Sequence, residues 1–199
     1  MRRLALRCLT VWLGPIALVS AQTASPAPLS AFATVIDADV TTQAKLFVDA
    51  AEAMPVDRFD ASPEQLGIPG SDFQGVRTFG EQVKHVAADN FAIWAAVAGE
   101  PEPPGTDAPN GPPEMKSRDD ILDFLKASVE YSHRTVPSLT SENALQLVEF
   151  RKGQTTRISL VILALTHATT HYGHLAEYLR DYGVIPPASR PMSMPMPAQ

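Results

Sequence analysis

Segments rich in proline and glycine divide the sequence into four windows of helical periodicity. This division constrains the fold more than any other feature. Within each window apolar residues recur at a spacing of three or four, as in helices that bury one stripe. The windows cover 35–54, 79–98, Ser117 towards Pro137, and Thr155 or Thr156 to Gly183. Between them, 55–78 and 101–113 hold no sustained period, so we expect long connectors. The sequence therefore predicts an all-α fold, best satisfied by a four-helix bundle.

Local signals place the starts of two of these helices. Thr78 precedes Glu81 by three residues, which is the spacing of a capping box, and Ser117 stands in the same relation to Asp120. The segment Leu145–Phe150 fits either a short extended piece or a turn before the last helix. The predicted architecture thus contains little strand.

The N-terminus has the pattern of a cleaved secretory signal over residues 1–21. A basic start is followed by a short apolar run, Leu9–Val19, and by the small residues Ser20 and Ala21. The apolar run is too short for a comfortable membrane span. After it we expect a flexible leader at 22–33, a helical domain at 34–187 and a disordered tail, rich in proline and methionine, at 188–199. The protein is therefore expected to be periplasmic or secreted.

Removal of the signal changes the chemistry open to the chain. Cys8 would be lost, so the mature chain has no thiolate nucleophile, disulfide or cysteine metal ligand. Three arginines would also be lost from a total of 16 basic residues, leaving 13 against 22 acidic residues, a net charge of −9. An acidic protein of this kind is not expected to bind nucleic acid or an anionic membrane.

Histidines are the strongest candidates for chemistry. His167 and His171 form an H-x-x-x-H pair in the last window, and residues four apart share one face of a helix. Two imidazoles at this spacing can close on one metal ion. His85, on a second helix, is the preferred third ligand, while His174 is the alternative and otherwise lines the pocket. His133 is expected to be a solvated residue near a helix end.

Carboxylates near these histidines are candidates for the outer-shell partners that metal-bound imidazoles usually have. Glu81 and Asp89 lie four residues before and four residues after His85. Glu177 is the equivalent candidate on the last helix. Capping and solvated charges remain open as alternative roles for all three. The sequence holds no glycine-rich phosphate loop and no G-x-S-x-G nucleophile elbow.

Two motifs, in this order and spacing, resemble the DinB-like superfamily. One is R-T-F-G-E-Q-V-K-H-V-A-A-D-N-F-x-x-W from Arg77 to Trp94, and the other is H-A-T-T-H-Y-G-H-L-A-E-Y-L-R from His167 to Arg180. The closing G-V-I-P-P-A-S from Gly183 to Ser189 is similar as well. The resemblance extends over about residues 35–189, nearly the whole mature chain.

This resemblance implies an up-down-down-up four-helix bundle that carries one divalent metal ion, zinc or nickel, on three histidines. Carried over, the ligands are His85, His167 and His171, with Gly173 at the family's glycine and His174 where many members have glutamine. Members often form homodimers. Some are metal-dependent transferases acting with low-molecular-weight thiols, and others are similar to hydrolases or isomerases.

The predicted function is an exported, metal-dependent transferase or hydrolase with an unassigned substrate and unassigned acid or base residues. Export departs from the family's pattern, because its known thiol cofactors are cytosolic, and this leaves the substrate open. The alternative is a non-catalytic bundle that binds a metal or a small ligand. A third hypothesis is a bundle in which the histidines only pack.

Overall fold

Four helices form the body of the protein in the computed structural model, which describes residues 29–108 and 110–191. The helices are α1 (Ala31–Ala53), α2 (Phe79–Ala98), α3 (Arg118–Thr135) and α4 (Arg157–Asp181). Two strands, β1 (Leu147–Phe150) and β2 (Gly153–Thr156), form a hairpin between α3 and α4. The predicted signal peptide lies outside the described residues.

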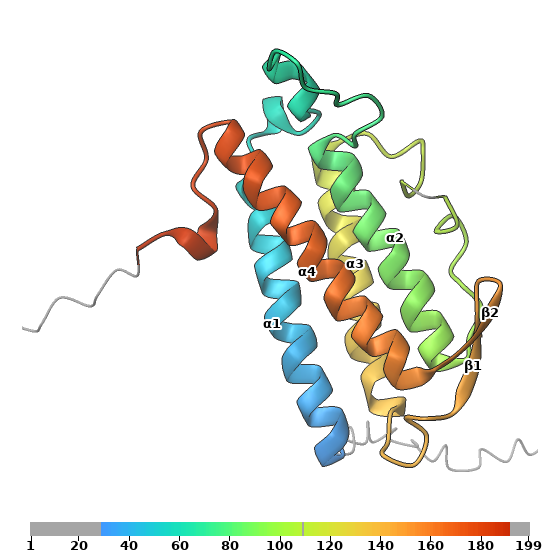
Figure 1. The fold of residues 1–199 in the computed structure, drawn as a ribbon. Helices are drawn as coiled ribbons and strands as arrows, with labels where there is room; N and C mark the ends of the chain where they lie inside the picture. Colours follow the sequence, from blue (N-terminus) through green and yellow to red (C-terminus); the bar gives the residue numbers. More distant parts are fainter. Residues whose placement is uncertain (1–28, 109, 192–199) are drawn as a thin grey trace, which may run out of the picture.

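The helices run up, down, down and up, as expected (Figure 1). Helices α2 and α3 are parallel, so the chain between them, 99–117, returns along the outside of the bundle (Figure 1). Helix α2 packs against both α3 and α4, and α1 closes the bundle against α3 and α4. Helix α2 therefore presents one face to α3 and another to α4.

Side-chain caps fix where the helices begin. The predicted capping box is present, since Thr78 Oγ1 accepts from the Glu81 amide and the Glu81 carboxylate accepts from the Thr78 amide. Ser117 caps α3 through the amide of Asp120, as predicted. Each cap satisfies a backbone N–H that has no partner inside its helix. Helix α1 begins at Ala31, so the last three residues of the predicted leader are helical.

The hairpin settles the open choice for Leu145–Phe150, because four of these residues form β1. Its partner β2 was not expected from the sequence. The strands pair antiparallel, with Leu147 opposite Thr156 and Phe150 opposite Gly153, which leaves a turn of two residues, Arg151 and Lys152. Thr156 then caps α4 through the amide of Ser159. The hairpin thus leads directly into the helix that carries the histidine pair.

Short 3₁₀ turns interrupt the connectors and the C-terminal end. They cover Val56–Arg58, Pro63–Leu66, Val136–Ser138 and Pro187–Ser189. The last of these turns runs from the end of the predicted domain, Pro187, into the predicted disordered tail, 188–199, so the start of that tail is helical. Residues 192–199 lie outside the described residues.

The core has two connected parts along the bundle. The end that contains the α1–α2 connector is built around Phe47, Phe79 and Leu179, and the opposite end around Trp94 and Leu160. Burial of this apolar surface provides the main stabilising free energy of such a bundle. No segment among the described helices is long and apolar enough to cross a membrane.

A buried lysine fixes the return connector to α2. Lys84 is only 5% exposed, and its Nζ donates to the carbonyl oxygens of Pro112 and Met115 at 3.2 and 3.1 Å. Burial lowers the pKa of the Lys84 ammonium. Gly111 approaches the Lys84 carbonyl so closely that a Cβ there would lie 3.1 Å from it. The connector is therefore held against the helix turn next to His85.

Candidate metal centre and adjoining cleft

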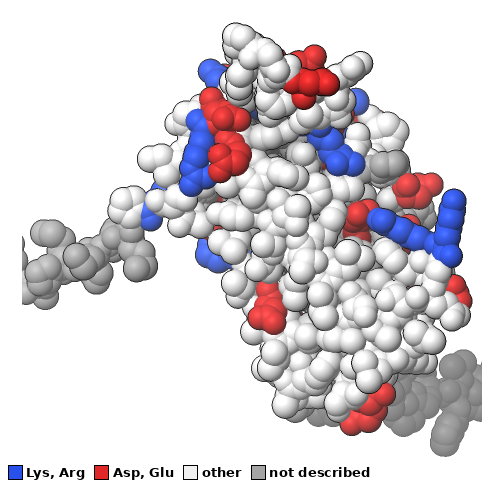
Figure 2. Space-filling view, in the orientation of Figure 1, with Lys and Arg blue, Asp and Glu red and all other residues white. Residues whose placement is uncertain are grey.

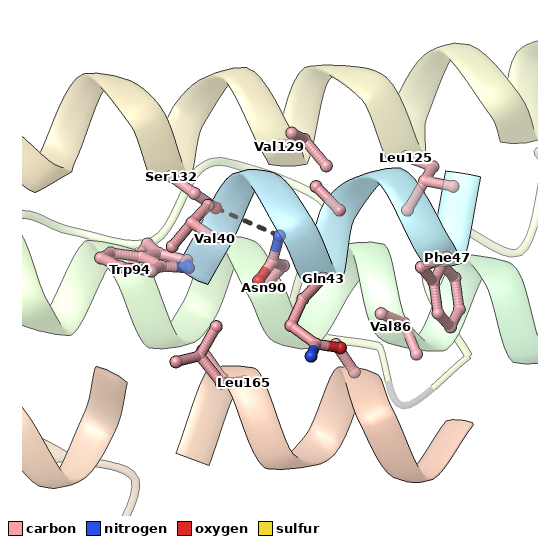
Figure 3. Close-up of a pocket in the computed structure, with 13 residues that line it drawn as sticks. Val40, Gln43, Phe47, Val86, Asn90, Trp94, Leu125, Val129, Ser132 and Leu165 are labelled. Atoms are coloured by element: carbon pink, nitrogen blue, oxygen red, sulfur yellow. Dashed lines mark hydrogen bonds between the residues drawn. The ribbon is translucent and has the colours of Figure 1, made fainter. Parts of the chain in front are cut away.

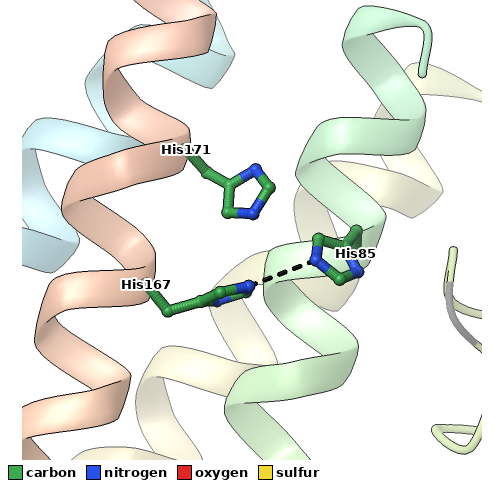
Figure 4. A group of neighbouring side chains, drawn as sticks. All are labelled: His85, His167 and His171. Carbon is green, nitrogen blue, oxygen red and sulfur yellow. Dashed lines mark hydrogen bonds between the residues drawn. The ribbon is translucent and has the colours of Figure 1, made fainter. Parts of the chain in front are cut away.

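Three imidazoles meet between α2 and α4 (Figure 4). Helix α2 supplies His85, and α4 supplies His167 and His171 from successive turns of one face. The structure thus brings together the three histidines that the sequence selected. Their placement follows from the i, i+4 spacing on α4 and from the packing of α2 beside that face.

The distances between these imidazoles match those of a metal site. His85 Nε2 and His167 Nε2 are 3.1 Å apart, and one ligand nitrogen from each of the three rings lies within 4.8 Å of the others. Two nitrogens bound tetrahedrally to Zn²⁺, at about 2.0–2.1 Å each, are separated by about 3.3 Å. The His85–His167 pair therefore already has the spacing of two ligands, and His171 lies near enough for side-chain rotation to complete the set.

Burial keeps the deepest of these imidazoles neutral. His171 is 8% exposed, and burial together with the nearby His167 and His85 lowers its pKa to about 3. Burial also lowers the pKa of His167, although the carboxylate of Asp89 opposes the shift. Neutral imidazoles keep a free lone pair at pH 7, which is the form that binds a metal ion.

Gln82 orients the buried imidazole. Its Oε1 lies 2.7 Å from His171 Nδ1, and the Gln82 side chain is itself buried. Because an amide oxygen only accepts, Nδ1 carries the proton and Nε2 keeps the lone pair. Sequence reasoning missed Gln82, although its position three residues before His85 on α2 places it on a neighbouring part of the same helix face.

The carboxylates expected around the cluster take different roles. Asp89 Oδ2 lies 3.4 Å from His167 Nε2, and its Oδ1 accepts from the Arg151 guanidinium at 3.0 Å. Glu81 caps α2 instead. Glu177 is 73% exposed and pairs with Arg180, so of its two expected roles the structure shows the solvated charge.

The other two histidines lie outside the group of three. The exposed ring of His174 stacks edge-on beside His171, with centroids 5.3 Å apart. His133 is not simply solvated as expected, because its Nδ1 lies 2.7 Å from Asp37 Oδ1 and links α3 to α1.

An open cleft of about 470 Å³ adjoins the histidines. Its walls come from α2, the return connector and the hairpin turn, and the lining residues are His85, Asp89, Ala92, Glu102, Thr106, Asp107, Ala108 and Arg151. This volume is in the range of small-molecule sites. One of the three imidazoles therefore faces a space that a small substrate can enter.

A second cavity lies inside the bundle and is far smaller, about 40 Å³ (Figure 3). It is lined mainly by apolar side chains, including Val40, Phe47, Trp94 and Leu165, with Asn90 pointing into it. This is enough for one or two water molecules and too little for an organic ligand. Small-molecule binding is therefore expected at the cleft and not in the bundle interior.

Comparison with known proteins agrees with this fold and with the resemblance of the sequence to the DinB-like superfamily. The sequence profile described as the DinB superfamily matches residues 40–175, a span that includes all three histidines. A DinB-like protein from Bacillus subtilis, YjoA, has a similar structure, with a TM-score of 0.55, 18% sequence identity, and coverage of 81% of this chain and 96% of that chain. No curated protein matches the sequence significantly.

Proposed function

Since the chain belongs to the DinB superfamily, we propose that His85, His167 and His171 bind one divalent metal ion. The proposed ion serves a transferase or hydrolase reaction on a small molecule in the adjoining cleft. One observation carries the proposal: three imidazoles converge, with one ligand nitrogen from each within 4.8 Å of the others, and a buried amide orients the deepest of them.

Imidazole ligands suit several first-row metals, zinc and nickel among them, and the resemblance to the DinB-like superfamily favours these two. Three protein nitrogens leave at least one coordination position for another ligand, as in catalytic sites and unlike closed structural sites. A bound ion would polarise a substrate group or lower the pKa of a coordinated group. Asp89 Oδ2 lies 3.4 Å from His167 Nε2, the nitrogen that also faces His85, so this carboxylate stands at the edge of the proposed site, and the cleft begins at His85.

Metal analysis of protein purified without a histidine tag tests the site. We expect about one equivalent of zinc or nickel and a metal-dependent rise in Tm, because the ion binds only the folded chain. His171→Ala should lose the bound metal, whereas His174→Ala should keep it. Less than a tenth of an equivalent, with no thermal shift on adding metal, would rule out the site.

An activity screen separates an enzyme from a non-catalytic metal-binding bundle. Thiol conjugation and the hydrolysis of esters and amides are measured with and without chelator, on wild-type protein and His171→Ala. A chelator-sensitive activity that His171→Ala lacks supports the enzyme. A protein that holds its metal but shows no such activity supports the binding bundle.

We also propose that the protein is exported, on the basis of the basic start, the short apolar run and the small residues of 1–21. Cell fractionation followed by N-terminal sequencing tests this. Cytosolic protein with an intact Met1 would contradict export.

A further inference from the structure

Arg151 adopts a backbone conformation that an arginine rarely takes. It is the first residue of the two-residue hairpin turn, with φ of 53°, and is the one non-glycine residue with positive φ in the described part of the chain. Turns of this kind favour glycine, asparagine or aspartate at that position. A strained residue beside a cleft suggests a role for its side chain.

The side chain of Arg151 reaches from the turn into the cleft beside the histidines. One guanidinium nitrogen donates to Asp89 Oδ1 at 3.0 Å, and the guanidinium lies 5.1 Å from the centre of the Phe150 ring. Asp89 in turn contacts His167 at 3.4 Å. A chain of contacts therefore connects the hairpin turn to the candidate metal ligands.

Most of the hydrogen-bonding capacity of this guanidinium remains available. A guanidinium has five N–H donors, and among the described residues Asp89 is the one acceptor bonded to Arg151. The Arg151 side chain is 60% exposed and lines the cleft together with His85. The geometry leaves its other edge open to a planar or tetrahedral anion entering the cleft.

The charges around the cleft give an anion a preferred side. In Figure 2, basic and acidic side chains adjoin at the edge of the bundle where the hairpin lies, beside a face with few charges. The connector wall carries the exposed carboxylates of Glu102 and Asp107, which repel an anion. The hairpin wall carries Arg151. Asp89, the third carboxylate of the lining, is already paired with Arg151, so an anionic group meets the least repulsion at the open edge of this guanidinium.

We propose that Arg151 is a substrate-positioning residue that binds an anionic group, a carboxylate or a phosphate, of a small molecule whose reacting part lies at His85, His167 and His171. This proposal rests on the proposed function of the histidine site. Arginine suits the role because its planar fork binds two oxygens of a carboxylate or phosphate at once.

A purely structural ion pair explains the contacts of Arg151 less well. An exposed pair with Asp89 contributes little to stability, whereas the positive φ carries a conformational cost that glycine at the same position would avoid. A binding role accounts for an arginine at this position better than an exposed ion pair does. Arg151→Gly therefore separates the two roles.

The test uses the full, metal-free protein titrated with inorganic phosphate and, separately, with acetate, at constant ionic strength set with chloride. Backbone amide NMR shifts of 85–92 and 150–153 report binding. We expect saturable shifts in the wild type and about tenfold weaker binding in Arg151→Gly, because charge-assisted hydrogen bonds are lost.

Lys152→Ala is the matched control. It removes the same charge from the same turn and should bind the anion within twofold of the wild type. Tm of Arg151→Gly should be no lower than that of the wild type.

Equal anion affinity in wild type and Arg151→Gly, or no saturable shift in the wild type, would overturn the proposal. So would a clear loss of Tm in Arg151→Gly, which would assign the residue a structural role. Tighter binding of phosphate or of acetate identifies the preferred anionic group. Metal content, measured on the same variants, keeps the two conclusions separate: metal-free titration detects the anion site even if the histidines bind no metal.

Discussion

Two polar regions interrupt the apolar packing of α2, and they differ in how their polar atoms are satisfied. Asn90 faces α3, where its side-chain amide donates to Ser128 and Ser132 over 3.2–3.4 Å (Figure 3). His85 faces α4, where it meets two further imidazoles (Figure 4). The first region pairs an amide donor with acceptors on the next helix, whereas the second gathers three imidazoles, two of them hydrogen-bonded to each other and the third to Gln82.

This difference separates a packing role from a binding role. A buried amide with complementary partners contributes to packing and to a unique arrangement of helices. Three imidazoles that share one space repel each other when protonated, and one metal ion between them would take a nitrogen lone pair from each. The polar region on the α4 side of α2 is therefore the one that is expected to bind a ligand.

The largest expected effect is the loss of metal affinity on replacing His85 with asparagine. Removing one of three nitrogen ligands should weaken binding more than 100-fold, about 3 kcal/mol, because each ligand carries a large share of the binding free energy. Competition with a chelator of known affinity measures it. Asn90→Ala, five residues along the same helix, should leave metal affinity within about threefold. Similar losses in both variants would contradict the contrast between the two regions.

A smaller loss is expected when Gln82 no longer orients His171. Gln82→Leu should weaken metal binding about 10–100-fold, as for other partners of metal-bound histidines. Gln82→Glu keeps an acceptor oxygen at the same position and should retain most of the affinity. The same chelator competition measures both variants. Equal affinity in Gln82→Leu and the wild type would show that His171 needs no such partner.

The Asn90 region should respond through stability and not through binding. Asn90→Ala removes hydrogen bonds to α3 and enlarges a small cavity, so it should lower the free energy of unfolding by about 1–2 kcal/mol. Urea denaturation of metal-free protein measures this. Thr166→Ala, an exposed position on α4, should stay within about 0.5 kcal/mol of the wild type. A loss of metal from Asn90→Ala protein that is still folded would weaken the contrast.

The parts of this molecule that were predictable are those whose signals are local. The capping box at Thr78 and the i, i+4 pair at His167 and His171 depend only on residues within one turn of each other. The contacts of Gln82 and Glu177 depend on how α2 and α4 rotate against each other, which packing decides. The strand Gly153–Thr156 was missed because Gly-Gln-Thr-Thr carries no alternation of apolar residues.

A further expected effect is a dependence of stability on pH that comes from one side of α2. The pKa of His171 is about 3 in the folded protein, compared with the ordinary value of 6.5 that we take for the unfolded chain. Between these values the unfolded chain binds a proton that the folded chain does not, so stability falls as the pH decreases from 6.5 and levels off near 3. The loss from this residue is at most about 1.4 kcal/mol per pH unit over that window.

Urea denaturation of metal-free protein at several pH values measures this slope. Carboxylates also contribute to it, so the informative quantity is the difference between wild type and a variant. His171→Asn should have a shallower slope by about one proton, whereas Asn90→Ala should keep the wild-type slope, because an amide does not titrate. An unchanged slope in His171→Asn would mean that His171 protonates equally in both states. The cluster would then not be held in the neutral, metal-binding form by the fold, and the contrast between the two sides of α2 would lose its electrostatic basis.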